Sequence, residues 1–76
     1  MVGARRNPAN HTVAERLGCS TPLISQYRTG RLTPSWSMME TIEKALGWPF
    51  EDQVNAKRSG TYSDGFESAV QSRWGR

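Results

Sequence analysis

The sequence predicts a compact all-α domain of about four to five short helices. Apolar residues recur at steps of three and four, the spacing that places them on one face of a helix. Glycines follow three of these stretches, at Gly18, Gly30 and Gly47, where a helix can end in the left-handed conformation. With 76 residues the chain can hold only one domain, whose stability must be marginal.

A first helix is predicted from Pro8 to Leu17, because Asn7 and Pro8 form a good cap and first-turn pair. A capping box of Thr12 and Glu15 would instead start this helix later. Its apolar face comprises Val13, Ala14 and Leu17.

A second helix, over 22–29, follows a turn of about three residues. Gly18 ends the first helix, and Ser20 or Thr21 opens the second before a proline. A helix that ends on glycine, turns through about three residues and restarts on a cap is the arrangement that lays a second helix in a DNA major groove. The inward face of this helix comprises Leu23, Ile24 and Tyr27.

From residue 13 to 30 the sequence VAERLGCSTPLISQYRTG resembles the Cro/lambda-repressor-like helix-turn-helix family. The resemblance continues through Gly30, Arg31, Pro34, Ser35 and the helix end Ala45-Leu46-Gly47, and it covers about residues 8–47. It implies a phage-type, sequence-specific regulator of double-stranded DNA that acts by occupying its operator, with the recognition helix 22–29 in the major groove.

Two further stretches have the helical spacing of apolar residues. Ser35 caps a third helix over about 36–46, and Gly47 ends it. A short helix begins near Phe50, which shares one side with Val54, and 57–60 forms a break. The apolar face of the third helix comprises Trp36, Met39, Ile42, Ala45 and Leu46, and we expect Trp36, Met38 and Met39 in the core.

Asp64 and Glu67 are predicted to cap a last helix, in which Phe66, Ala69, Val70 and Trp74 share a face. Family members have a full amphipathic helix ahead of the helix-turn-helix, whereas only about seven residues precede Pro8 here. The missing wall of the core is expected from the C-terminal segment, with Tyr62, Phe66, Val70 and Trp74. This segment either folds back or pairs with a second subunit, and we favour a homodimer.

The domain organisation predicted from these elements has three parts. Residues 1–7 form a flexible basic N-terminal arm, 8–58 form the helix-turn-helix DNA-binding domain, and 59–76 form a helical C-terminal segment that completes the core or dimerises. The positive charge is concentrated in the N-terminal half of the chain, with the predicted helix-turn-helix and its arm. Residues 1–39 carry five arginines and one glutamate, a net charge of +4, whereas 40–76 carry five basic and six acidic residues.

Composition also excludes several classes of site. One cysteine and one histidine allow no internal disulfide and no zinc cluster, so we expect no metal. No nucleophile beside a base and no glycine-rich phosphate loop is visible, so we expect no enzyme, no cofactor and no small-molecule ligand. Without a long apolar run or a secretory signal, the chain is expected in the cytoplasm, that of a bacterial host if phage-encoded, and not in a membrane.

The outward residues of the second helix match base-contacting positions of the family. Gln26 is the best candidate for direct reading, because its amide can donate to and accept from adenine. The candidate base-contacting residues are Thr21, Pro22, Ser25 and Gln26.

Candidate phosphate contacts flank this set. Asn10 and His11 lie at the start of the first helix, where backbone N–H groups favour an anion. Thr29 and Arg31 match positions from which family members reach the DNA backbone. Arg28 either contacts phosphate or pairs with an acid such as Glu15. Arg5 and Arg6 of the arm either enter the minor groove or remain solvated.

Two other functions remain open at this stage. One is an antitoxin-type protein-interaction module that also binds its own operator, which an exposed C-terminal segment would favour. The other is an excision-type architectural protein, which bends DNA and tolerates base changes.

Overall fold

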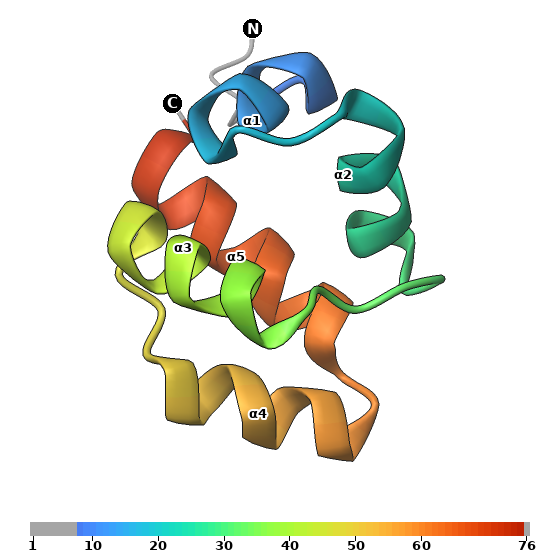
Figure 1. Cartoon of the computed structure of the whole chain (residues 1–76), viewed down its shortest axis with the longest axis vertical. Coiled ribbons are helices and arrows are strands. Elements are labelled where there is room, and N and C mark those ends of the chain that lie inside the picture. The colour runs from blue at the N-terminus through green and yellow to red at the C-terminus, as the bar shows by residue number, and fades with distance from the viewer. Residues whose placement is uncertain (1–7, 76) are drawn as a thin grey trace, which may run out of the picture.

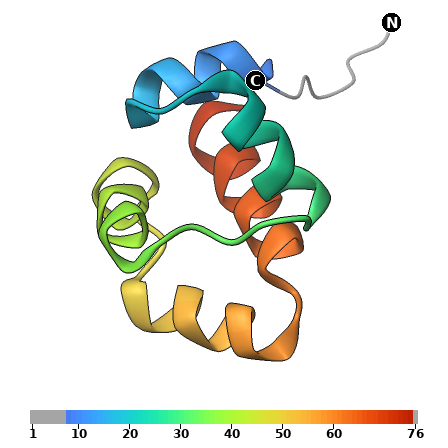
Figure 2. The same ribbon diagram turned by 45° about the vertical axis from the view of Figure 1, so that its right-hand side comes forward.

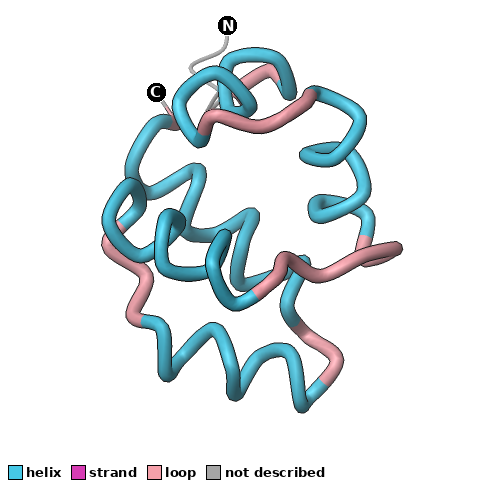
Figure 3. The backbone as a smooth tube through the Cα atoms, viewed as in Figure 1, coloured by secondary structure: helices cyan, strands magenta, loops and turns pink. Residues whose placement is uncertain are grey.

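The computed structural model describes residues 8–75, and five α-helices account for most of them (Figure 1). Between residues 8 and 75 the rest is turn and loop, with no β-strand (Figure 3). The all-α fold predicted from the sequence is therefore confirmed. The helices are α1 (Asn10–Leu17), α2 (Thr21–Thr29), α3 (Trp36–Leu46), α4 (Phe50–Ser59) and α5 (Tyr62–Trp74).

The helix α5 lies at the centre of the molecule and packs against α2, α3 and α4 (Figure 1 and Figure 2). At one end of the molecule α1 packs against α2 and α3, and α4 closes the opposite end. The C-terminal segment thus folds back within one chain and forms one wall of the core. Its apolar stripe is covered by the chain's own helices, because Tyr62, Phe66 and Val70 are at most 2% exposed.

The core draws on all five helices. On α3 the cap is as expected, since the Ser35 hydroxyl accepts a hydrogen bond from the Met38 N–H. On α4 the buried residue is Gln53, which is fully buried. The buried apolar residues are Val13, Ala14, Leu17, Ile24, Tyr27, Met39, Ile42, Leu46, Tyr62, Phe66 and Val70.

Helix ends differ from the predictions by more than one residue at three places. The helix α1 starts at Asn10 and not at Pro8, because Ala9 is in an extended conformation with ψ of 152°. The helix α4 runs through Ser59, where a break had been expected, and ends at Gly60 with φ of +75°. The helix α5 begins at Tyr62, so Asp64 lies inside its first turn and is not its cap.

Trp36 is 56% exposed, so its prediction as a core residue is wrong. Trp36 is the first residue of α3. Its ring centroid lies 5.6 Å from that of Phe50, and Nζ of Lys57 lies 5.1 Å from the centroid of the Trp36 ring. Met39, at the next position of the same apolar stripe, is fully buried as expected. Helical periodicity predicted the face of α3 on which Trp36 lies, but Phe50 and Lys57 of α4 cover its side chain only in part.

Among residues 8–75 no helix is both long and apolar enough to cross a lipid bilayer. The same residues contain no group of three or more His, Cys, Asp or Glu side chains arranged to hold a metal ion.

Candidate nucleic-acid interface

The turn between α1 and α2 is built as the sequence predicts. Gly18 has φ of +74°, and its N–H donates to the Ala14 carbonyl at 2.8 Å. The Cys19 N–H donates to the same carbonyl at 3.0 Å. The Cys19 side chain packs against the core, and burial raises the pKa of its thiol, which disfavours the reactive thiolate. The turn therefore holds α2 across α1 through backbone geometry and packing.

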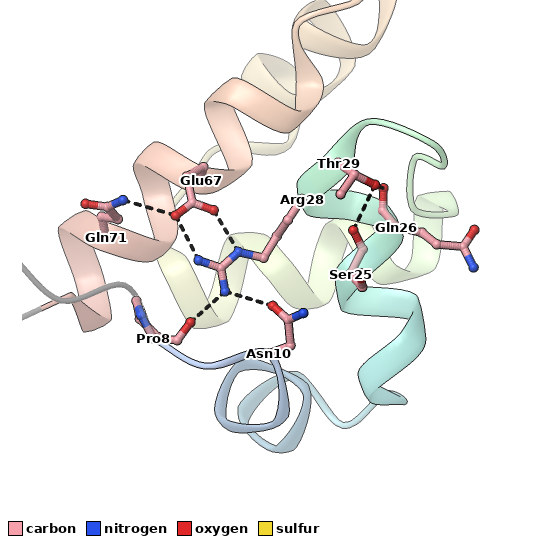
Figure 4. Close-up of polar contacts among 8 residues, drawn as sticks. All are labelled: Pro8, Asn10, Ser25, Gln26, Arg28, Thr29, Glu67 and Gln71. Atoms are coloured by element: carbon pink, nitrogen blue, oxygen red, sulfur yellow. Dashed lines mark hydrogen bonds and ion pairs between the residues drawn. The ribbon is translucent and has the colours of Figure 1, made fainter.

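The outward face of α2 borders a surface hollow of about 460 Å³. Pro22 and Gln26 on this face are exposed, Ser25 is half-buried, and Gln26 points away from the body of the molecule (Figure 4). Thr21 is also exposed, at the first position of α2, but it does not line the hollow. The lining residues are Pro22, Ser25, Gln26, Thr29 and Arg31.

The starts of α1 and α2 have no side-chain caps. Ala9 precedes α1, and the Ser20 hydroxyl at the start of α2 makes no capping hydrogen bond, in contrast to Ser35 at α3. The first amide N–H groups of α1 have no partner within their own helix, and the same holds for α2 except that Pro22 has no N–H. His11 lies exposed at the start of α1. These two helix ends thus offer N–H donors to an anion.

Thr29 and Arg31 lie at the far end of α2. The Thr29 hydroxyl donates back to the Ser25 carbonyl at 3.0 Å, so its proton is already used within α2 (Figure 4). Arg31 is exposed beside the hollow, and its N–H donates to the Gln26 carbonyl at 3.0 Å. Of these two candidate phosphate contacts, Arg31 is the one with an available positive charge.

Arg28 does not face the hollow. Its guanidinium forms a two-pronged ion pair with Glu67 of α5, with Nε to Oε1 at 2.7 Å and Nη2 to Oε2 at 2.8 Å (Figure 4). The side chain is only 12% exposed, so the prediction of Arg28 as a phosphate contact is not supported by its placement. An acid partner had been the alternative, but that partner is Glu67 and not Glu15. Packing of α5 against α2 brings the two together.

Asn10 is also drawn into this cluster, because its Oδ1 accepts a hydrogen bond from Arg28. Its side chain is therefore held inward, and only its backbone N–H remains for an anion at the start of α1. Arg5 and Arg6 lie outside the described residues. Of the residues expected to contact phosphate, His11, Thr29 and Arg31 keep exposed side chains.

The ion pair predicts an acid-dependent loss of stability. The Arg28 guanidinium, with help from Gln71, lowers the pKa of Glu67 below its ordinary value of 4.5. A carboxyl whose pKa is lower in the folded than in the unfolded state stabilises the protein at pH values above its unfolded-state pKa. This stabilisation is lost as the pH falls through the folded-state pKa. We expect Glu67→Gln to lower the free energy of unfolding by about 1 kcal/mol at neutral pH.

Urea unfolding of both proteins between about pH 7 and about pH 3 measures this difference. The difference in the free energy of unfolding between wild type and Glu67→Gln should become smaller as the pH falls below 4.5. A gap that stays constant over this range would show that the charge on Glu67 does not stabilise the fold.

Two features of the structure were missed in the sequence analysis. One is Gln53, which could have been found because Phe50, Gln53 and Val54 are spaced at three and four along one face of α4. The other is the surface around Trp36, where Leu32 is also 43% exposed. No sequence signal distinguishes Trp36 from a core residue.

The comparisons with known proteins leave the family open. No protein-family model matches the chain, and neither a curated protein nor a solved structure matches it. The resemblance over residues 8–47 therefore stays a hypothesis.

Proposed function

We propose that the protein is a sequence-specific regulator that binds double-stranded DNA and acts by occupying its operator. The observation that carries this proposal is the grouping of Pro22, Ser25, Gln26, Thr29 and Arg31 around one hollow on the outward face of α2. An exposed amide on a helix held by a tight turn, with an exposed arginine just past the end of that helix, suits base edges and phosphates of a major groove. The uncapped start of α1 adds donors for a second phosphate.

Gln26 is the residue we assign to base reading. We expect Gln26→Ala to lower discrimination at one or two base pairs by about 1 to 3 kcal/mol while non-specific binding stays nearly unchanged. Selection of bound duplexes from a random library, followed by binding titrations, measures both quantities. Asn55→Ala, an exposed amide on α4, is the matched control and should select the wild-type sequence. An unchanged base preference in Gln26→Ala would contradict this role.

Arg31 is the residue we assign to the DNA backbone. Each phosphate contact contributes roughly −0.9 to the slope of log affinity against log salt, so Arg31→Ala should reduce that slope by about one. Arg58→Ala removes an exposed arginine from the end of α4 and should leave the slope unchanged. Equal slopes for Arg31→Ala and wild type would show that Arg31 does not touch phosphate.

A protein-interaction module of the antitoxin type is the second candidate. The exposed side chains of Leu32 and Trp36, at 43% and 56%, favour it. An exposed C-terminal segment would have favoured it further, but α5 contributes Tyr62, Phe66 and Val70 to the core. Copurification with a specific partner protein would support this candidate. A DNA affinity that does not change when the bases are changed would instead support an architectural protein.

A further inference from the structure

Arg28 joins three segments that are distant in the sequence. Besides the two bonds to Glu67, its Nη1 donates to the Pro8 carbonyl at 2.7 Å and to Asn10 Oδ1 at 3.1 Å (Figure 4). Gln71, one turn further along α5, donates from Nε2 to Glu67 Oε2 at 3.0 Å and holds the carboxylate in place. We call Arg28, Glu67, Pro8 and Asn10 the guanidinium clamp.

The ion pair of Arg28 with Glu67 lies beside the outward face of α2 and not within it. On α2, Arg28 points towards α5 and the start of α1, whereas Gln26 points to solvent (Figure 4). The hollow bordered by Gln26 and Arg31 does not include Arg28. Arg28 is therefore placed to fix the position of the start of α1 relative to the outward face of α2.

A change in the relative position of α1 and α2 should affect contacts to base edges and contacts to phosphates to different degrees. Base-edge hydrogen bonds carry the sequence information and tolerate little displacement, because a recognition surface must be held within about 0.5 Å of its productive geometry. Phosphate contacts, which dominate non-specific affinity, depend mainly on charge. A residue that only positions α1 against α2 should therefore affect specific binding and leave non-specific binding unchanged.

We propose that Arg28 is a positioning residue for sequence-specific DNA binding: through the guanidinium clamp it fixes the start of α1 against α2, without touching DNA itself. This inference rests on the function proposed above. The planar fork of an arginine is required, since a lysine ammonium at the same place keeps the charge but cannot bond Glu67 through two parallel N–H groups while also reaching Pro8 and Asn10.

Arg28→Lys is therefore the informative variant, with Arg73→Lys on the exposed side of α5 as its matched control. Affinity is measured for the selected duplex and for an unrelated duplex of equal length, over a range of salt. We expect Arg28→Lys to lower the ratio of specific to non-specific affinity by at least about tenfold, with an unchanged salt slope. Arg73→Lys should keep the wild-type ratio. Partial unfolding alone would lower both affinities together and leave the ratio unchanged.

The opposite results are equally clear. A wild-type ratio in Arg28→Lys overturns the proposal. The proposal is also overturned if the slope of log affinity against log salt falls in magnitude by about 0.9 in Arg28→Met but not in Arg28→Lys. That pattern would identify a direct contact between Arg28 and a phosphate. If Arg28→Lys does not fold, Glu67→Gln is compared in the same way and must show the same loss of ratio. A wild-type protein that prefers no sequence overturns the proposed function, whereas a selective wild type with an equally selective Arg28→Lys overturns only the role of Arg28.

Discussion

Gln53→Leu is expected to destabilise the protein by about 3 kcal/mol or more, although leucine is apolar and similar in size. Gln53 is fully buried, and its Nε2 donates to the carbonyls of Met39 at 2.8 Å and Trp48 at 3.0 Å. Its Oε1 accepts from the Tyr62 hydroxyl at 2.8 Å. Leucine would leave the Trp48 carbonyl and the Tyr62 hydroxyl without this partner, each at a cost of roughly 1 to 3 kcal/mol, and the Met39 carbonyl would keep only its bond within α3.

The effect should be large because the network joins three helices. Gln53 belongs to α4, Met39 to α3 and Tyr62 to α5, and no buried side-chain polar atom of the described residues lacks a partner. Burial raises the pKa of Tyr62, as expected for a hydroxyl kept neutral and donating inside the protein. Satisfied buried polar groups of this kind fix how α4 packs on the rest of the core.

Urea unfolding followed by circular dichroism measures the loss in Gln53→Leu. Asn55→Leu, at an exposed position of the same helix, is the control and should change the free energy of unfolding by less than about 0.5 kcal/mol. Equal stability of Gln53→Leu and Asn55→Leu would mean that the Gln53 hydrogen bonds contribute nothing to the fold.

Gly65→Ala is expected to destabilise the protein by about 1 to 3 kcal/mol. This is opposite in sign to the gain of about 1 kcal/mol that alanine gives over glycine in an exposed helix. A Cβ at residue 65 would lie 2.6 Å from Cζ2 and 2.8 Å from Cη2 of Trp48, far inside van der Waals contact. The Trp48 ring packs on Tyr62 at 4.8 Å between centroids, so moving it disturbs the core.

Thermal unfolding of Gly65→Ala, with Ser68→Ala at an exposed position of α5 as control, measures this effect. Gly65→Ala should cost less stability in a Trp48→Leu background than in the wild type, because the clash needs both side chains. A Gly65→Ala protein that is more stable than wild type would show that Trp48 moves away at no cost.

Local signals predicted most of the helices. The bounds of α3, the Ser35 cap and the glycine ends of α1, α2 and α3 follow from residues adjacent in sequence, and the structure has them where expected. The outward orientation of Gln26 follows equally from helical periodicity. These features depend on backbone geometry and on one face of one helix, which a sequence reveals directly.

Tertiary contacts were beyond local signals. The partner of Arg28 is 39 residues away, and nothing in the spacing of the sequence prefers Glu67 over Glu15. Trp36 has the periodicity of a core residue, yet it lies where α3 begins, and α4 covers it only in part. The burial of Gln53 depends on carbonyls at the ends of other segments, which only the assembled fold brings within reach.

Nuclear magnetic resonance of the ¹⁵N-labelled protein, titrated with a duplex selected from a random library, tests DNA binding by the outward face of α2 most directly. We expect the largest backbone shift changes at Thr21, Gln26, Arg31 and the start of α1, with α4 almost unaffected. Changes centred on Trp36 and Lys57 while α2 remains unaffected would contradict the account, and so would a selection that enriches no sequence.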